Sequence, residues 1–150
     1  MANEKILIVD DEKLVRWSLR QKCEELGYHV LEAGTGTEAL RLAGAESPDL
    51  TLLDVHLPDM NGIEVLDRLK QSGDCRAAIM ITADPQLDDV KTAIKLGAYD
   101  FVGKPLDFDE LGVTIQNALE ATRLRAKWNH SAARSAGALA TTMSSGFPGK

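Results

Sequence analysis

Five short, mostly apolar runs, each followed by a stretch of helical periodicity, constrain the fold of this chain most. The runs occupy residues 5–9, 28–33, 50–53, 77–82 and 99–103. In the segments after them, apolar residues recur at spacings of three and four, which is typical of a helix with one buried face. Strands that alternate with helices through short loops form a parallel sheet covered on both faces. We therefore expect an α/β fold with five strands and five helices.

Turn and capping residues mark the ends of these segments. Thr35 or Thr37 can cap the second helix, and Asp107 begins a capping-box pattern that Glu110 completes three residues later. The run at 28–33 is the least apolar, which favours a place near the edge of the sheet. The strand order expected for such a chain is flavodoxin-like, 2-1-3-4-5.

Composition limits the class of protein. The 150 residues suffice for one domain with a hydrophobic core, and 44% of them are hydrophobic. A net charge of −6 argues against direct contact with nucleic acid by this segment. No apolar run reaches the ~18 residues of a membrane span, and the N-terminus does not read as a signal peptide. Cys23 and Cys75 lack metal-ligand spacing, so we expect free thiols in a cytoplasmic protein without membrane contact.

The C-terminal part differs from the rest. Ala, Ser, Gly and Thr dominate from about Ser131, a composition that cannot bury enough surface to fold. Before it, Ala121, Leu124 and Trp128 continue the helical spacing and form a short seam that predicts pairing with a second copy. The alternative is that this stretch frays. We expect a domain at residues 1–122 and a helical extension at residues 123–130. Residues 131–150 are expected to be a flexible linker or the end of an expressed fragment.

Chemically useful side chains fall at the carboxyl ends of the expected strands. The set consists of Asp10 and Asp11 after the first strand, Asp54 on the third, Thr82 on the fourth and Lys104 after the fifth. These ends meet at one edge of a doubly wound sheet. A carboxylate held there can attack phosphorus and become an aspartyl phosphate.

The pattern also predicts a cation. The three carboxylates repel one another unless a positive charge offsets them, and Mg²⁺ with oxygen ligands is the usual partner of phosphate chemistry. Thr82 and Lys104 can each contact a phosphoryl oxygen. Each residue also has a simpler role: Asp10 or Asp11 as a helix cap, Thr82 as an ordinary strand residue, Lys104 as a solvated end. The joint pattern favours a phosphoacceptor site.

The chain resembles the receiver domains of bacterial two-component response regulators. The matching segments are 8–12, 53–62, 81–83 and 104–105, and the resemblance covers about residues 4–122. It implies a phosphorylation-activated signalling switch. Such a domain is not an enzyme with outside substrates, because it catalyses only its own phosphorylation and dephosphorylation.

The resemblance assigns roles to residues. It implies that Asp54 is the phosphoacceptor and that a sensor histidine kinase is the phosphoryl donor. It implies that Asp11, Asp54 and the main-chain carbonyl of His56 bind Mg²⁺ (or Mn²⁺), with Asp10 beside them in the metal site. It further implies that Lys104 contacts the phosphoryl group and that its bond to the following proline is cis, for which proline has a low penalty.

The implied switch pair is Thr82 and Phe101. Phosphorylation adds a charge of about −1.5 to −2 at the acceptor. Thr82 then moves toward it, Phe101 turns inward, and the surface formed by the fourth helix, fifth strand and fifth helix changes. The same surface, with the helical extension, is implied to form a homodimer.

Two positions depart from the commonest receiver pattern. His56 lies two residues after Asp54, and Asp84 lies two residues after Thr82. Both should flank the entrance to the site, where we expect them to tune the rate of dephosphorylation. The alternative is that His56 only lines its loop and that Asp84 only precedes a proline turn.

A finer resemblance is to receivers of the nitrogen-regulatory (NtrC-like) type, which belong to sigma-54 activators. Residues 14–19 and 97–101 carry it. Regulators of this type continue into an ATPase domain and a DNA-binding domain. Residues 1–150 contain no Gly-rich phosphate loop of an ATPase, so the resemblance implies an output domain C-terminal of residue 150 that controls transcription. The alternative is a single-domain receiver that acts by protein–protein binding.

Three other classes fit less well. A phosphatase of the haloacid-dehalogenase type carries a second Asp two residues after its nucleophile, where this chain has His56. A flavin-binding relative of flavodoxin needs a phosphate loop after the first strand, where Asp10 and Asp11 would repel the phosphate. The complete set of site residues argues against a receiver-shaped scaffold that is never phosphorylated.

Overall fold

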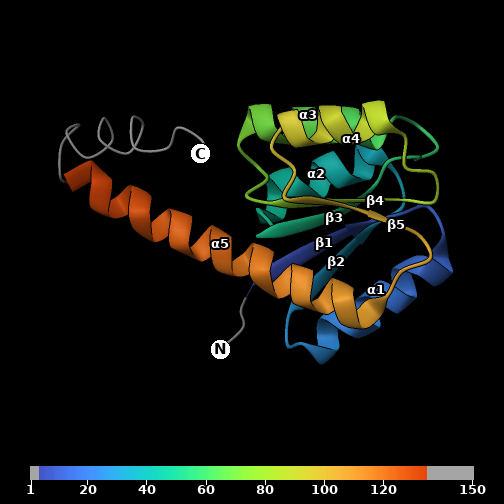
Figure 1. The fold of residues 1–150 in the computed structure, drawn as a ribbon, viewed down its shortest axis with the longest axis horizontal. Helices are drawn as coiled ribbons and strands as arrows, with labels where there is room; N and C mark the ends of the chain where they lie inside the picture. Colours follow the sequence, from blue (N-terminus) through green and yellow to red (C-terminus); the bar gives the residue numbers. More distant parts are fainter. Residues whose placement is uncertain (1–3, 135–150) are drawn as a thin grey trace. The chain divides into compact units, whose positions relative to one another are not determined.

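The computed structural model describes residues 4–134 of the chain, with side chains as far as Arg125. Within that range there are five parallel strands: β1 (Lys5–Val9), β2 (His29–Ala33), β3 (Leu50–Asp54), β4 (Ala78–Thr82) and β5 (Asp100–Gly103). Their order in the sheet is β2-β1-β3-β4-β5, which confirms the expected flavodoxin-like fold and places the least apolar strand at an edge (Figure 1).

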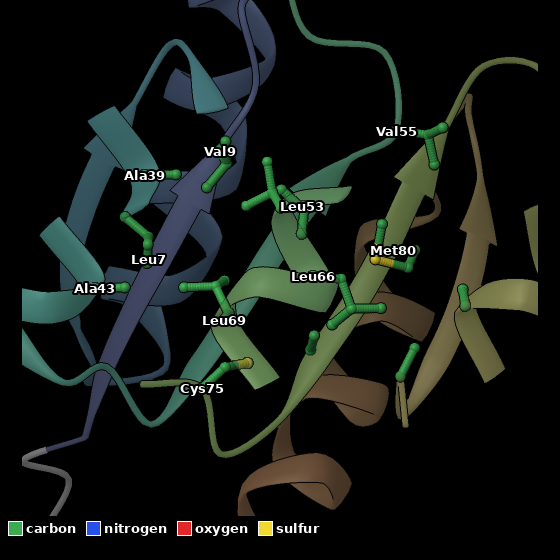
Figure 2. Packing of buried hydrophobic residues seen from close by; sticks show 14 of the residues in the cluster. Leu7, Val9, Ala39, Ala43, Leu53, Val55, Leu66, Leu69, Cys75 and Met80 are labelled. Atoms are coloured by element: carbon green, nitrogen blue, oxygen red, sulfur yellow. The ribbon is translucent and has the colours of Figure 1, made fainter. Parts of the chain in front are cut away.

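Helices cover both faces of the sheet (Figure 1). In the described range they are α1 (Lys13–Glu25), α2 (Gly36–Glu46), α3 (Gly62–Ser72), α4 (Leu87–Lys95) and α5 (Phe108–Arg134). Successive residues of a strand face opposite sides. On β1, Leu7 packs under α2 and α3, as Figure 2 shows, whereas Ile6 and Ile8 pack on the opposite face with α1 and α5. All residues of β3 and β4 are buried, which agrees with the largely apolar sequences of these two strands.

The caps of the helices follow local sequence in most cases. Thr35 caps α2 by accepting a hydrogen bond from the amide of Glu38, and Asp107 accepts from two amides at the start of α5. The simpler role of a carboxylate after β1 as a helix cap is wrong. Glu12 occupies the N-cap position of α1 and makes no side-chain capping bond.

The chain divides into two compact units, Met1–Leu119 and Glu120–Lys150. Helix α5 continues to Arg134, beyond the expected end of the extension at residue 130. The side chain of Trp128, on which the predicted seam depends, lies outside the described residues, as do residues 135–150. Among residues 4–134, no helix combines the length and the apolar character that a membrane span requires.

Candidate functional site

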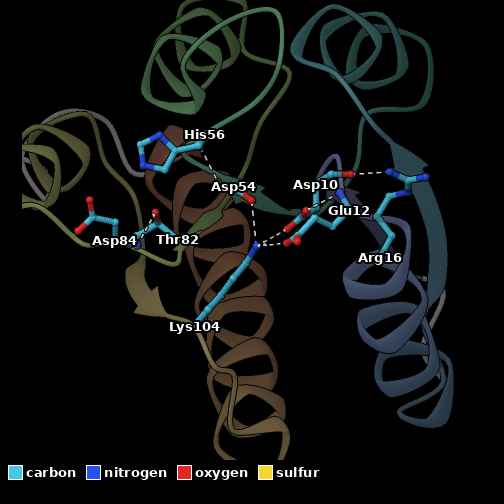
Figure 3. A network of polar contacts seen from close by, with 8 residues as sticks. All are labelled: Asp10, Glu12, Arg16, Asp54, His56, Thr82, Asp84 and Lys104. Atoms are coloured by element: carbon cyan, nitrogen blue, oxygen red, sulfur yellow. Dashed lines mark hydrogen bonds and ion pairs between the residues drawn. The ribbon is translucent and has the colours of Figure 1, made fainter.

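The predicted site residues converge at the carboxyl edge of the sheet (Figure 3). Asp54 is the last residue of β3 and Thr82 the last of β4, while Asp10 follows β1 directly and Lys104 follows β5. Asp10, Asp54 and Thr82 are buried in spite of their polarity. Buried polar groups are retained where partners satisfy them, so their partners decide what the site can do.

Lys104 joins carboxylates from two strands. Its Nζ lies 2.9 Å from Oδ2 of Asp10, 3.0 Å from Oδ2 of Asp54 and 3.2 Å from Oε1 of Glu12. Burial alone would lower the pKa of Lys104, but its hydrogen bonds and ion pairs with Asp10 and Asp54 outweigh burial and raise the pKa above its ordinary value. The ammonium therefore stays charged. The Lys104–Pro105 peptide bond is cis, as the resemblance implied.

Asp10, Asp11 and Asp54 form a compact acidic group. Among the described residues, each of the three offers a carboxylate oxygen, and these oxygens all lie within 4.8 Å of one another. Burial raises the pKa of Asp10, and the charge of Asp54 adds to this, against the opposing bonds from the Glu12 amide and Lys104. An exclusively oxygen donor set of this kind fits a hard divalent cation such as Mg²⁺ or Mn²⁺.

The loop after β3 is held tightly against Asp54. The amide of His56 donates to Oδ1 of Asp54 at 2.9 Å, and the amide of Gly62 donates to the carbonyl of Val55 at 2.6 Å. A Cβ at Gly62 would lie 2.1 Å from the carbonyl oxygen of Asp54, so only glycine fits there. His56 and Asn61 face each other in an antiparallel bridge. The hydrogen bond of this bridge joins their neighbours, Gly62 and Val55. The amide of His56 therefore faces the Asp54 carboxylate and not Asn61.

Thr82 ends β4, and Asp10 follows β1. Because β3 lies between these two strands, Thr82 and Asp10 lie on opposite sides of Asp54. The hydroxyl of Thr82 accepts a hydrogen bond from the amide of Asp84 at 3.2 Å. His56 and Asp84 are both exposed, and Figure 3 shows their side chains near Asp54 and Thr82. Phe101 on β5 is partly buried against the core cluster of α2, α3 and α4. A cavity of about 400 Å³ lies beside it, along the edge of β5 and the start of α5.

Sequence reasoning missed three residues near this site. Glu12 is an additional partner of Lys104, which the acidic run after β1 could have suggested. Arg16 donates from α1 to the main-chain carbonyl of Asp10, and no sequence pattern marks such a bond. Asp59 ties the loop after β3 to the start of α2, accepting from the amides of Gly36 (2.8 Å) and Thr37 (3.0 Å) and from the Thr37 hydroxyl (2.7 Å).

Residues 6–116 match the family described as the response regulator receiver domain. This match spans most of the chain. The protein is a member of the response regulator receiver family. Receiver domains act as phosphorylation-dependent switches in two-component signalling, and the acidic edge of this sheet is the place in the fold where a receiver's site is expected.

Relatives of this receiver domain differ in length. It is 40% identical over 119 residues to sporulation initiation phosphotransferase F of Bacillus subtilis, covering 79% of this chain and 96% of that protein. It is 34% identical over 129 residues to the regulatory protein AtoC of Escherichia coli, covering 86% of this chain but 28% of AtoC. Several other curated relatives are covered over about half of their length.

Solved structures give the same picture for the receiver fold. The crystal structure of NtrX from Brucella abortus superposes with a TM-score of 0.78 at 30% identity, covering 86% of this chain and 30% of that one. The similarity to AtoC and NtrX is a weak pointer to one subgroup, because receivers of other kinds match at comparable identity.

Proposed function

We propose that this receiver domain accepts a phosphoryl group on Asp54 from a sensor histidine kinase. The placement of Asp54 carries the proposal. It is a buried carboxylate at the end of β3, 3.0 Å from the ammonium of Lys104 and clustered with Asp10 and Asp11. A carboxylate fixed beside a permanent positive charge suits a nucleophile that receives a negatively charged group.

The transfer exchanges one bond to phosphorus for another. A carboxylate oxygen of Asp54 attacks, the P–N bond to the phosphohistidine of the kinase breaks, and an acyl phosphate forms. The His56 amide and the Lys104 ammonium bond to different oxygens of Asp54, which fixes the plane of the carboxylate before attack. Lys104 can then exchange its bond to Asp54 for a charge-assisted bond to the phosphoryl group.

A divalent cation fits this site. Asp10, Asp11, Asp54 and the main-chain carbonyl of His56 are the residues that would hold Mg²⁺ or Mn²⁺. The all-oxygen cluster of Asp10, Asp11 and Asp54 supports this assignment. When bound, the ion supplies positive charge beside the phosphoryl oxygens during in-line transfer.

Thr82 and Phe101 are the proposed switch residues. The Thr82 hydroxyl accepts from the Asp84 amide and still has a proton to donate, which it can give to a phosphoryl oxygen. Movement of Thr82 frees space for Phe101, whose partly buried ring lies at the margin of the core. The surface of α4, β5 and α5 then changes and carries the signal.

The relatives support two alternatives for how this receiver domain passes on its signal. The match to a fraction of AtoC and NtrX supports an NtrC-like regulator with a transcriptional output domain beyond residue 150. The match to nearly all of the sporulation phosphotransferase supports a single-domain receiver that acts by protein binding. The reading frame beyond residue 150 decides between them. In either case we propose a cytoplasmic protein.

Homodimerisation through α4, β5, α5 and the helical continuation of α5 is part of the proposal. The helix continues to Arg134, and Leu124 is 54% exposed on it. Ala121, Leu124 and Trp128 recur in this stretch at spacings of three and four, a pattern that favours a partner helix. Sedimentation of residues 1–150 against a chain that ends at Thr122 tests this. If both chains sediment as monomers at high micromolar concentration, with and without phosphorylation, homodimerisation through this surface is excluded.

Intact-mass measurement tests the phosphoacceptor function. The chain incubated with acetyl phosphate and Mg²⁺ should gain the mass of one phosphoryl group, and EDTA should suppress the gain. Undiminished phosphorylation in EDTA would rule out the role of the divalent cation. No gain from acetyl phosphate or from any phosphorylated histidine kinase would rule out the function.

A further inference from the structure

Arg16 reaches from α1 to the backbone of the acidic loop. Its side chain is only 16% exposed. Nη1 donates to the main-chain carbonyl of Asp10, and Nε donates to Oε1 of Glu32 on β2 at 3.1 Å. Figure 3 shows the guanidinium approaching Asp10 from the side opposite Asp54 and Lys104. Arg16 therefore contacts the loop without entering the group of carboxylates.

The carbonyl that Arg16 binds belongs to the peptide group between Asp10 and Asp11. Two other bonds hold the same loop: the Asp10 amide donates to the carbonyl of Ala33 at 3.1 Å, and the Glu12 amide donates to Oδ1 of Asp10 at 2.9 Å. These bonds fix Asp10 and its side chain. The bond from Arg16 holds the plane of the next peptide group, and with it the position of the Asp11 Cα from which the Asp11 side chain extends.

Glu32 supports Arg16 from behind. Its two carboxylate oxygens accept hydrogen bonds from Arg16 and from Arg20. Burial by itself would raise the pKa of Glu32, but the bonds from Arg20 and Arg16 outweigh burial and lower it. The negative charge of Glu32 offsets a guanidinium that would otherwise oppose a cation bound at the neighbouring acidic group.

We infer that Arg16, supported by Glu32, is a positioning residue for the divalent-cation site, through the peptide group that joins Asp10 to Asp11. This inference rests on the proposed function, because it assigns a task to Arg16 only if the acidic group binds a cation. The competing role is a purely structural tie between α1 and β2. The two roles differ in one respect: a structural tie changes stability, whereas a positioning residue changes the affinity for the ion.

Arg20 provides a matched control. It also pairs with Glu32, but its other hydrogen bond goes to Glu24 in its own helix and not to the acidic loop. Calorimetric titration of the unphosphorylated full chain with Mg²⁺ should show a dissociation constant raised about tenfold or more in Arg16→Met, as loss of outer-shell support does in metal sites. The dissociation constant of Arg20→Met for Mg²⁺ should stay within about twofold of the parent value, because Arg20 does not contact the acidic loop. Denaturant unfolding in EDTA measures the effect of each change on the fold.

The rate of phosphorylation by acetyl phosphate distinguishes a loss of Mg²⁺ affinity from a general disruption of the site. Raising the Mg²⁺ concentration should return the acetyl phosphate reaction of Arg16→Met close to the parent rate, because the defect is in ion binding. If Arg16→Met fails to fold, Arg16→Lys serves instead. A single ammonium cannot span both partners, so weaker Mg²⁺ binding than in Arg20→Met is again expected.

The outcomes are distinct. If the parent binds Mg²⁺ and is phosphorylated but the Arg16 variants bind Mg²⁺ as tightly as Arg20→Met, this inference is wrong and the proposed function stands. If the parent neither binds Mg²⁺ nor gains a phosphoryl group, the proposed function itself fails, and the inference fails with it.

Discussion

The ammonium of Lys104 lies 3.0 Å from Oδ2 of Asp54, although 50 positions separate the two residues in sequence. The same ammonium lies 2.9 Å from Oδ2 of Asp10. Lys104 is thus an internal counterion for two buried carboxylates, and its side chain is only 14% exposed. Removal of one partner from such a group leaves charge uncompensated, which costs more than the pair itself contributes.

Lys104→Ala should therefore keep the fold but respond weakly to phosphorylation. In EDTA we expect its free energy of unfolding to fall by ~1–3 kcal/mol, because Asp10 and Asp54 lose their cation. Phosphorylation-induced chemical shift changes in α4 and β5 should shrink, because a charge-assisted contact to the phosphoryl group is lost. Arg41→Ala, which removes an exposed cation on α2, outside the surface of α4, β5 and α5, is the control. Equal shift changes in parent and Lys104→Ala would contradict the role of Lys104.

Thr82→Ala should accept phosphate and yet switch poorly. The variant keeps Asp54 and the acidic group, so acetyl phosphate should still label it. It loses the hydroxyl that is proposed to meet the phosphoryl group and that now accepts from the Asp84 amide. NMR spectra before and after phosphorylation measure the switch. If Thr82→Ala shows the parent's full set of shifts, the pairing of Thr82 with Phe101 is wrong.

His56 and Asp84 should influence the lifetime of the phosphorylated state. Both side chains are exposed, and Figure 3 shows them near Asp54 and Thr82. Replacement of either by Ala should change the dephosphorylation rate several-fold, since side chains near a reacting water alter its access and orientation. Decay of purified phosphoprotein in Mg²⁺, after removal of acetyl phosphate, gives the rate. Indistinguishable rates for the parent and both variants would leave these residues with the simpler role of lining loops.

Asp59 should contribute stability that acid removes. Hydrogen bonds from the Thr37 hydroxyl and from the amides of Gly36 and Thr37 lower its pKa to about 2, from 3.8 in the unfolded chain. A lowered folded-state pKa stabilises the fold above the unfolded pKa, and the contribution disappears as pH falls through about 2.

Urea titrations between pH 5 and pH 2 can detect this contribution. The parent should lose more stability over this range than Asp59→Asn, because the variant has no carboxylate to protonate at that site. Asp67→Asn, which removes a partly exposed carboxylate that accepts a hydrogen bond from Gln71 in the same helix, is the matched control. Identical pH slopes for the parent and Asp59→Asn would contradict the prediction.

Much of the fold was predictable because hydrophobic period and turn residues act locally. The continuous apolar runs of β3 and β4 could only be strands buried on both faces, and burial of Leu52 and Ile79 on one face and Leu53 and Met80 on the other confirms this. The convergence of Asp10, Asp54 and Lys104 followed from parallel topology alone. Their roles stay predictions.

What sequence could not supply are bonds between side chains and distant main-chain atoms. Arg16 to the carbonyl of Asp10 and Asp59 to the amides of α2 depend on how elements dock, and no periodicity encodes that geometry. The alternative role of Asp10 as a cap of α1 is excluded by contacts of the same kind. The carboxylate of Asp10 bonds to Lys104 and to the Glu12 amide, so it is not available to the first turn of the helix.

Phosphorylation of Asp54→Asn tests the central claim most directly. The parent, Asp54→Asn and the matched control Asp67→Asn are incubated with acetyl phosphate and Mg²⁺, and their intact masses are compared. The parent and Asp67→Asn should each gain one phosphoryl group, and Asp54→Asn should gain none. A full gain of mass by Asp54→Asn would show that the phosphoacceptor lies elsewhere.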